Sequence, residues 1–189
     1  MSENDRSGTS GERVVRILYA KLGTSRFISS RYLAVVLERA LRRIDFPFVF
    51  TQGFHPRPRM RFCPSLPVGI AGTNEFFDVV AREPVDPASL RKRANPLLPP
   101  AMRFISCRSL PAGADGLPSG LMARYRIEKT SSLNAAALAG VGRIAAETEN
   151  DITVEVCLNR FNHAALRSAA GGGYIERTLV YDEEDAGRI

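Results

Sequence analysis

The chain has 189 residues, of which 44% are hydrophobic and 24% are charged, and its formal net charge is +6 at pH 7. These proportions are ordinary for a globular protein of one larger or two small domains. No apolar run approaches the length of about 20 residues that spans a bilayer, and the polar start Met1–Gly11 lacks the apolar core of a signal peptide. We therefore expect a cytoplasmic protein without membrane contact.

The charge is unevenly distributed along the chain. Residues 1–109 contain 18 basic and 9 acidic side chains and carry +9, whereas residues 110–189 contain 8 and 11 and carry −3. A basic first half predicts attraction to a polyanion or to an acidic surface of a partner protein.

The three cysteines, Cys63, Cys107 and Cys157, are far apart and form no Cys-x-x-Cys pair. This spacing favours neither a disulfide framework nor a zinc site, and it lacks the clustered cysteines that hold a [4Fe–4S] cluster. We expect reduced thiols and neither a metal nor another cofactor.

The residue pattern of the first half predicts six elements in the order strand, helix, strand, strand, helix, strand. Residues 13–21 and 46–51 are rich in β-branched or aromatic side chains, and the helix between them begins at Ser29 or Ser30 and runs to about Ile44. Its apolar residues recur at helical spacing and form one buried stripe. That stripe consists of Leu33, Val36, Leu37, Ala40, Leu41 and Ile44.

Further along, the pattern predicts a strand over 75–82, a helix over 86–95 that begins with Asp86 and Pro87, and a strand over 102–108. The resulting order is β-α-β-β-α-β. This order is typical of the ferredoxin-like fold, an α+β fold in which both helices cover one face of an antiparallel sheet.

A second, smaller α/β unit is expected after a linker rich in proline and glycine. Strands are predicted over 121–129, 151–158 and 174–181, with an Ala-rich helix over 133–146 and a short helix over 162–170. This order is one strand short of repeating the first half. The expected organisation is a disordered leader at 1–12, a ferredoxin-like domain at 13–109, a linker at 110–120, the smaller unit at 121–181 and an acidic tail at 182–189.

The segment between Phe50 and Ile70 contains four prolines and three arginines, and we call it the Pro/Arg segment. Pro56 and Pro58 restrict the backbone to extended conformations. Because alternate side chains of an extended chain share a face, we expect Arg57, Arg59 and Arg61 to point one way, with Met60 and Phe62 pointing the other way. Planar guanidinium groups held in such a row suit the bidentate recognition of phosphate or carboxylate. A solvated basic loop remains the alternative.

Six short strings of the first half resemble a known bacterial family. They are Tyr19–Gly23, Arg26–Ser29, Glu38–Arg43, Gln52–Arg59, Leu66–Gly69 and Glu75–Asp78. Together they are similar to the radical-SAM-linked domain of unknown function, which occurs alone or fused to radical SAM proteins. The resemblance covers residues 13–109 and, more loosely, 121–181. It implies association with a radical SAM enzyme and a role in RNA modification or processing.

The expected ligand-binding residues lie in the Pro/Arg segment. Aromatic side chains between arginines suit the stacking of RNA bases, and a glycine permits backbone conformations closed to other residues. The set comprises Gln52, Gly53, Phe54, His55, Arg57, Arg59 and Arg61. We assign no catalytic residue, because the segment holds no carboxylate to orient His55 as a base.

The function expected from the sequence is that of an RNA-binding accessory protein working with a radical SAM enzyme. One alternative is a module that docks onto the radical SAM partner without contacting RNA. A further alternative is a ribonuclease-like enzyme that uses His55 as an acid or base, since the layout is also similar to that of ferredoxin-like endoribonucleases that process CRISPR repeats.

Overall fold

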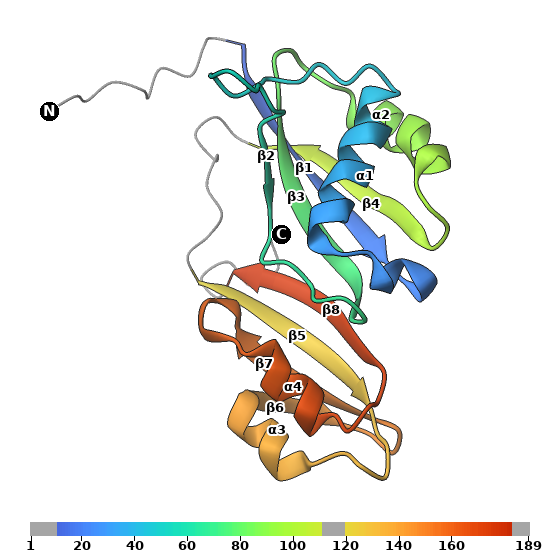
Figure 1. Cartoon of the computed structure of the whole chain (residues 1–189), viewed down its shortest axis with the longest axis vertical. Helices are drawn as coiled ribbons and strands as arrows, with labels where there is room; N and C mark the ends of the chain where they lie inside the picture. The colour runs from blue at the N-terminus through green and yellow to red at the C-terminus, as the bar shows by residue number, and fades with distance from the viewer. Residues whose placement is uncertain (1–10, 111–119, 183–189) are drawn as a thin grey trace, which may run out of the picture.

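The computed structural model describes residues 11–110 and 120–182, and these form a mixed α/β structure in which eight strands share one sheet (Figure 1). The strands are β1 (Arg13–Lys21), β2 (Met60–Phe62), β3 (Ala71–Ala81), β4 (Met102–Ser109), β5 (Leu121–Glu128), β6 (Arg143–Glu147), β7 (Asp151–Cys157) and β8 (Ile175–Asp182). The helices are α1 (Ser30–Arg42), α2 (Pro87–Ala94), α3 (Ala135–Val141) and α4 (His163–Ala169), with 3-10 turns η1 (Gly23–Phe27), η2 (Asn95–Leu97) and η3 (Leu158–Arg160).

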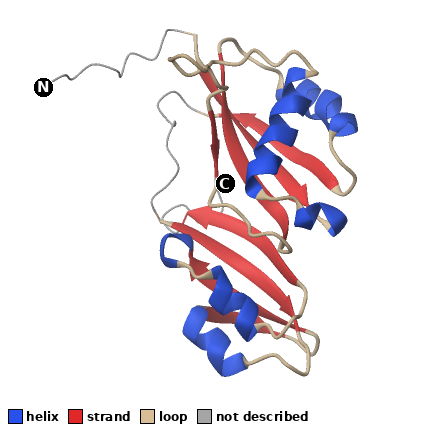
Figure 2. Ribbon diagram, viewed as in Figure 1, coloured by secondary structure: helices blue, strands red, loops and turns tan. Residues whose placement is uncertain are grey.

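In the first half, β1 lies between β3 and β4, and β2 pairs with the other edge of β3. All three pairings are antiparallel. Helices α1 and α2 pack on one face of these strands (Figure 2), where their apolar side chains join Val15, Ile17, Phe77 and Phe104 in a buried cluster.

The first helix begins and packs as its sequence predicts. The Ser29 side chain accepts a hydrogen bond from the Tyr32 N–H at the N-terminus, which satisfies one of the free donors of the first turn. Leu33, Leu37 and Leu41 are buried, and Leu37 is 0% exposed. The predicted apolar stripe is therefore the face that α1 presents to the sheet.

The predicted strand over 46–51 is misplaced. In that stretch only isolated bridges form, from Phe48 to Ala81 and from Phe50 to Pro58, while the continuous ladder with β3 is made by Met60–Phe62. Proline has no N–H to donate, so the chain around Pro47 and Pro58 cannot form an unbroken ladder. β3 also begins earlier than predicted, at Ala71 instead of Glu75.

The second half has the element order β-α-β-β-α-β, the same as the first. β5 lies between β7 and β8, and β6 pairs with the other edge of β7, again with antiparallel pairings. The predicted helix over 133–146 was too long, because α3 ends at Val141 and β6 follows it. Each strand of the first half thus has a counterpart with the same neighbours in the second half, a repeat that the sequence pattern does not show.

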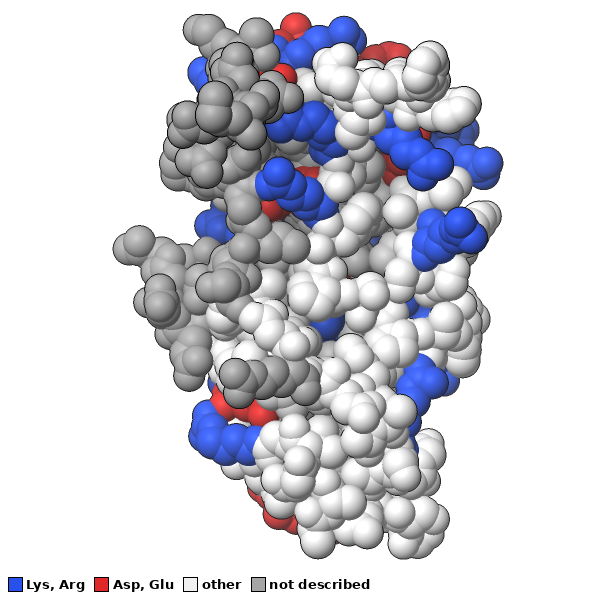
Figure 3. All heavy atoms as spheres, turned by 60° about the vertical axis from the view of Figure 1, so that its left-hand side comes forward, with Lys and Arg blue, Asp and Glu red and all other residues white. Residues whose placement is uncertain are grey.

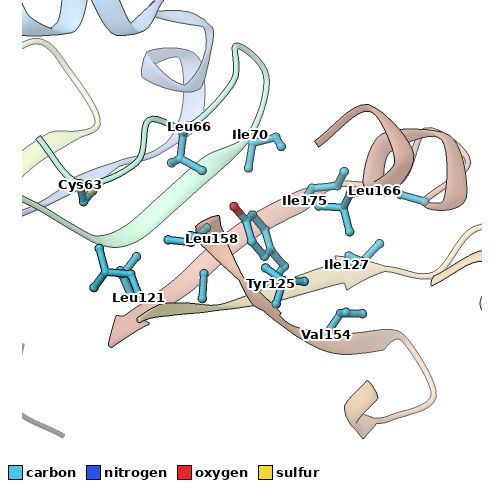
Figure 4. Packing of buried hydrophobic residues seen from close by; sticks show 14 of the residues in the cluster. Cys63, Leu66, Ile70, Leu121, Tyr125, Ile127, Val154, Leu158, Leu166 and Ile175 are labelled. Atoms are coloured by element: carbon cyan, nitrogen blue, oxygen red, sulfur yellow. The ribbon is translucent and has the colours of Figure 1, made fainter. Parts of the chain in front are cut away.

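The two halves join edge to edge, because β3 and β8 pair in parallel at Ala71–Glu176 and Gly72–Arg177. Beneath this junction, a second buried cluster combines Leu18, Leu66 and Phe76 of the first half with the apolar side chains of β5, β7, α3 and α4. Figure 4 shows Tyr125 at its centre, with its hydroxyl directed towards the segment that carries Leu66 and Ile70.

The expected leader, linker and tail lie largely outside the described residues, and the division into two domains stays a prediction. Within the described ranges, no helix is long and apolar enough to cross a membrane.

Candidate functional site

The Pro/Arg segment forms a hairpin whose tip, residues 52–56, is exposed. Below the tip, the Thr51 N–H donates to the Arg57 carbonyl over 2.8 Å, and the Arg57 N–H donates to Thr51 Oγ1 over 3.0 Å. Gly53 has a φ of +119°, a conformation that side chains with a Cβ rarely adopt. The glycine therefore allows the tip to turn.

Side chains alternate across the hairpin strand that follows the tip. Met60 and Phe62 pack against the core beneath α1, where the Phe62 ring stacks on Phe77 with 5.4 Å between centroids. Arg59 and Arg61 lie on the opposite face and line a pocket of about 270 Å³. The expected alternation therefore holds from residue 59 to residue 62.

Arg61 belongs to a row of charged side chains that crosses the sheet. In the strand registers, Arg61 is opposite Asp78, Asp78 is opposite Arg16, and Arg16 is opposite Arg108. Residues directly opposite in antiparallel strands share a face. We call these four residues the arginine row; it spans β2, β3, β1 and β4 on the face that α1 and α2 leave uncovered.

The centre of the arginine row is a buried ion pair. Arg16 Nε and Nη2 donate to the two carboxylate oxygens of Asp78 over 2.7 and 2.8 Å, and the Arg16 guanidinium lies 4.4 Å from the centroid of the Phe76 ring. Asp78 thus pairs with Arg16, the central arginine of the row. Arg61 and Arg108, at its two ends, are exposed.

The other residues predicted to bind the ligand differ in their distance from the arginine row. Arg59 is next to the row in the pocket and pairs with Glu12 over 2.8 Å. Arg57 is exposed and is not among the residues that line the pocket. Phe54 is 101% exposed at the tip, and His55 next to it is exposed. Figure 3 shows basic side chains gathered over the first half on the side where β2 lies.

A second polar cluster, which the sequence did not predict, is buried where the halves meet. Arg177 on β8 donates through Nε to Glu75 Oε1 over 2.7 Å, and its Nη2 donates to Glu75 Oε2 and to the Pro64 carbonyl. Arg177 and Glu75 are 0% and 1% exposed in their side chains. The pair is extended by Tyr125, whose hydroxyl lies 3.4 Å from Arg177 Nη1 and 3.1 Å from His163 Nε2.

Burial keeps the thiol, phenol and imidazole of this cluster in their neutral forms at neutral pH. Burial raises the pKa of the Cys63 thiol to about 12, so the sulfur stays protonated. Burial also raises the pKa of Tyr125 to about 12. Burial, together with the charges of Arg177 and Arg167, lowers the pKa of His163 to about 4, so its ring is neutral. The hydrogen bonds of Arg177 to Glu75 and to the Pro64 carbonyl connect β8 of the second half with the first half.

The sequence did contain one sign of this connection. Glu75 and Arg177 are charged residues in strands that are otherwise largely apolar, and a charge in such a place must be paired. Their separation of 102 positions left the partner unidentifiable. Within residues 11–110 and 120–182, no group of three or more histidine, cysteine, aspartate or glutamate side chains is arranged to hold a metal ion.

Comparison with known proteins places the chain in a family. Residues 14–157, more than half of the chain, match the family described as "Uncharacterized protein conserved in bacteria (DUF2344)". The chain belongs to this family. The expected membership in an uncharacterised bacterial family is thereby confirmed, while the partnership with a radical SAM enzyme stays a prediction. A search of curated proteins found no match.

Proposed function

We propose that the protein binds RNA through the arginine row, Arg59 and the hairpin tip, as an accessory protein to a radical SAM enzyme. The observation that carries the RNA proposal is the placement of three arginines and one aspartate in a single row across one sheet face. Guanidinium groups are the side chains that most often contact nucleic-acid phosphates, and the two ends of this row, Arg61 and Arg108, are exposed. The link to a radical SAM enzyme rests on the resemblance of the six short strings in residues 19–78.

The ion pair at the centre of the row supports this role through its rigidity. Arg16 is fixed by two hydrogen bonds to Asp78 and by the Phe76 ring, so the row is anchored before a ligand arrives. Arg61 and Arg108 extend from that anchor to opposite edges of the first-half sheet. Charged side chains that are already ordered lose little conformational entropy when a ligand binds.

The exposed tip suits a contact with unpaired bases. The Phe54 ring lies fully in solvent, so both of its faces are accessible to a partner. Base stacking on an aromatic ring contributes about 1–3 kcal/mol per base. Phosphates over the row and a base on Phe54 together favour single-stranded RNA.

The ion pair between Glu12 and Arg59 makes a distinctive prediction about this site. A phosphate that binds Arg59 must compete with the Glu12 carboxylate, which lies 2.8 Å away. In a filter-binding titration with a single-stranded oligoribonucleotide, Glu12→Gln should therefore bind more tightly than wild type. Arg59→Gln and Arg61→Gln should each bind more weakly by about 1–3 kcal/mol.

A control variant separates these effects from a general loss of charge. Lys92 is exposed on α2, on the face opposite the arginine row, so Lys92→Gln removes one positive charge without touching the proposed site. The proposal fails if Lys92→Gln weakens binding as much as Arg59→Gln and Arg61→Gln do. It also fails if the wild type binds no RNA.

Protein docking is the second candidate, and the fully exposed Phe54 is the observation that favours it. In that case Phe54 and the arginines contact an acidic, partly apolar surface of the radical SAM partner. Loss of partner binding in Phe54→Ala, together with no RNA binding, would support this candidate. A nuclease role for His55 receives no such support, since no hydrogen bond orients His55 within the described ranges.

We also propose that each half has the ferredoxin-like topology. Supporting this classification, both halves share the order β-α-β-β-α-β, and in both the fourth and third strands flank the first. The row then crosses the face of a four-stranded antiparallel sheet opposite its two helices, and its exposed ends, Arg61 and Arg108, are the parts that can contact an extended nucleic-acid strand.

A further inference from the structure

A small pocket lies beside the arginine row, where the hairpin strand meets β1 and β3. Its volume is about 270 Å³. Pockets for small ligands usually measure about 300–1,000 Å³, so this one suits a single nucleobase better than a larger ligand. Arg59 and Arg61 line it together with apolar side chains.

The apolar side of the pocket is formed by Val14, Val80 and Pro58, which are all half-buried. Val14 on β1 and Val80 on β3 are directly opposite each other in the strand register. Each is two positions from a member of the arginine row, so both lie on the same face of the sheet as the row. A charged phosphate gains nothing from apolar neighbours, whereas the flat faces of a base are stabilised when they leave water.

The two arginines form most of the polar side. Arg59 and Arg61 are two positions apart on the strand that follows the hairpin tip, and Arg59 is held by an ion pair with Glu12 over 2.8 Å. A guanidinium group is planar and carries five N–H donors. It can therefore donate two parallel hydrogen bonds to a ligand that has adjacent acceptors.

The other polar groups of the pocket keep donors in the majority. The Thr51 hydroxyl oxygen accepts from the Arg57 N–H over 3.0 Å, and its O–H is a further donor. Asp78 also lines the pocket, but it is buried and already accepts two hydrogen bonds from Arg16. The pocket therefore suits a ligand edge that presents acceptors.

Of the four RNA bases, guanine fits this arrangement best. Its major-groove edge carries two adjacent acceptors, O6 and N7, whereas the same edge of adenine combines an acceptor with a donor. Cytosine has only a donor there, and uracil has a single acceptor, O4. The bidentate contact of an arginine with O6 and N7 is the commonest base-specific contact between proteins and nucleic acids. In single-stranded RNA this edge is open to a protein.

We propose that this pocket binds a guanine base of the RNA, with Val14, Val80 and Pro58 against the ring and with Arg59 and Arg61 donating to O6 and N7. This selectivity rests on the proposed RNA binding, to which it adds a preference for one base. Because each guanidinium group has five donors, the same arginines can also contact the phosphate beside that base.

Filter-binding titration of the full-length protein with four oligoribonucleotides of equal length tests the pocket. One is an oligouridylate, and in each of the others a single central uridine is replaced by guanosine, adenosine or cytidine. Because all four carry the same number of phosphates, differences in affinity report the base. The guanosine oligonucleotide should bind about tenfold more tightly than the other three.

Two substitutions separate base recognition from phosphate binding. Arg61→Lys keeps the charge but lacks the planar fork, and Val80→Phe places a larger side chain in the pocket. Each should reduce the preference for the guanosine oligonucleotide over the oligouridylate from about tenfold towards none. Val35→Phe is the matched control and should keep the wild-type preference, because Val35 is exposed on α1, which packs on the opposite face of the sheet. Arg61 is exposed, so Arg61→Lys remains informative if Val80→Phe does not fold.

The outcomes distinguish the pocket from the general binding of RNA. Equal affinity for all four oligonucleotides, or a preference for another base, overturns the guanine pocket and leaves the proposed RNA binding in place. A guanosine preference that persists in both Arg61→Lys and Val80→Phe also overturns the pocket. The absence of binding to every oligonucleotide overturns both proposals.

Discussion

Replacing Arg177 with methionine tests whether the buried ion pair holds the two halves together. Methionine keeps most of the apolar stem but removes the guanidinium that contacts both Glu75 oxygens, the Pro64 carbonyl and the Tyr125 hydroxyl. Glu75, 1% exposed, would then be a buried carboxylate without its main partner. Breaking a buried pair in this way costs about 3–5 kcal/mol of unfolding free energy.

The surroundings of Glu75 place the expected loss at the lower end of that range. Burial lowers the pKa of Lys21, and the nearby Glu75 carboxylate acts in the opposite direction and raises it. In Arg177→Met, Lys21 therefore still provides positive charge near Glu75. We therefore expect a loss of about 3 kcal/mol, measured by urea denaturation followed by circular dichroism. The exposed pair between Glu38 and Arg42 is the matched control, and Arg42→Met should cost less than about 1 kcal/mol.

A second substitution separates the charge effect from lost packing. In the Glu75→Gln/Arg177→Met double variant, a neutral amide replaces the unpaired carboxylate. This variant should be more stable than Arg177→Met alone, because an unpaired buried charge costs more than a neutral polar group. The ion pair does not hold the halves together if the double variant is less stable than the single variant, or if Arg177→Met costs less than about 1 kcal/mol of unfolding free energy.

Three further substitutions test other parts of the fold. His163 has a folded-state pKa of about 4, below its usual 6.5, so its contribution to stability is present above pH 6.5 and is lost as the pH falls towards 4. In urea denaturation at pH 7 and pH 5, His163→Gln should therefore lose less stability on acidification than wild type does. An equal loss in the two proteins would contradict this. Leu37 is a fully buried residue of α1, and Leu37→Ala should lower the unfolding free energy by about 2–5 kcal/mol. A change below about 1 kcal/mol would mean that α1 does not pack on the sheet. Gly171 has a φ of +59°, and its Cβ would contact the Ser132 carbonyl oxygen, so Gly171→Ala should lower the melting temperature; Gly140→Ala, at an unobstructed position on α3, should not.

Local sequence signals predicted the elements that form from neighbouring residues. The stripe Leu33–Leu37–Leu41 and the cap Ser29 defined α1, and Asp86 with Pro87 defined the start of α2, where the carboxylate accepts from the Ala88 and Ser89 N–H groups. These signals come from hydrogen bonds and periodicity within a few turns. They do not depend on the rest of the fold.

Features that depend on distant residues could not be predicted in the same way. The sequence of β6, Arg143-Ile-Ala-Ala-Glu147, continues the Ala-rich composition of α3, and only its pairing with β7 makes it a strand. The arginine row likewise depends on registers among four strands. The alternation of Arg59 and Arg61 was visible locally, but the positions of Arg16 and Arg108 beside them were not.

The salt dependence of RNA binding tests most directly whether the protein binds RNA phosphates through Arg59 and Arg61. The affinity for a single-stranded oligoribonucleotide is measured at several salt concentrations, and its logarithm is plotted against the logarithm of the salt concentration. The slope gives the number of phosphates that the protein neutralises, at about −0.7 per phosphate. We expect a clear negative slope for wild type. The slope should be shallower by about 1.4 for Arg59→Gln/Arg61→Gln and close to the wild-type value for Lys92→Gln. A flat wild-type slope, or a double variant with the wild-type slope and affinity, would show that the protein does not bind RNA through these arginines.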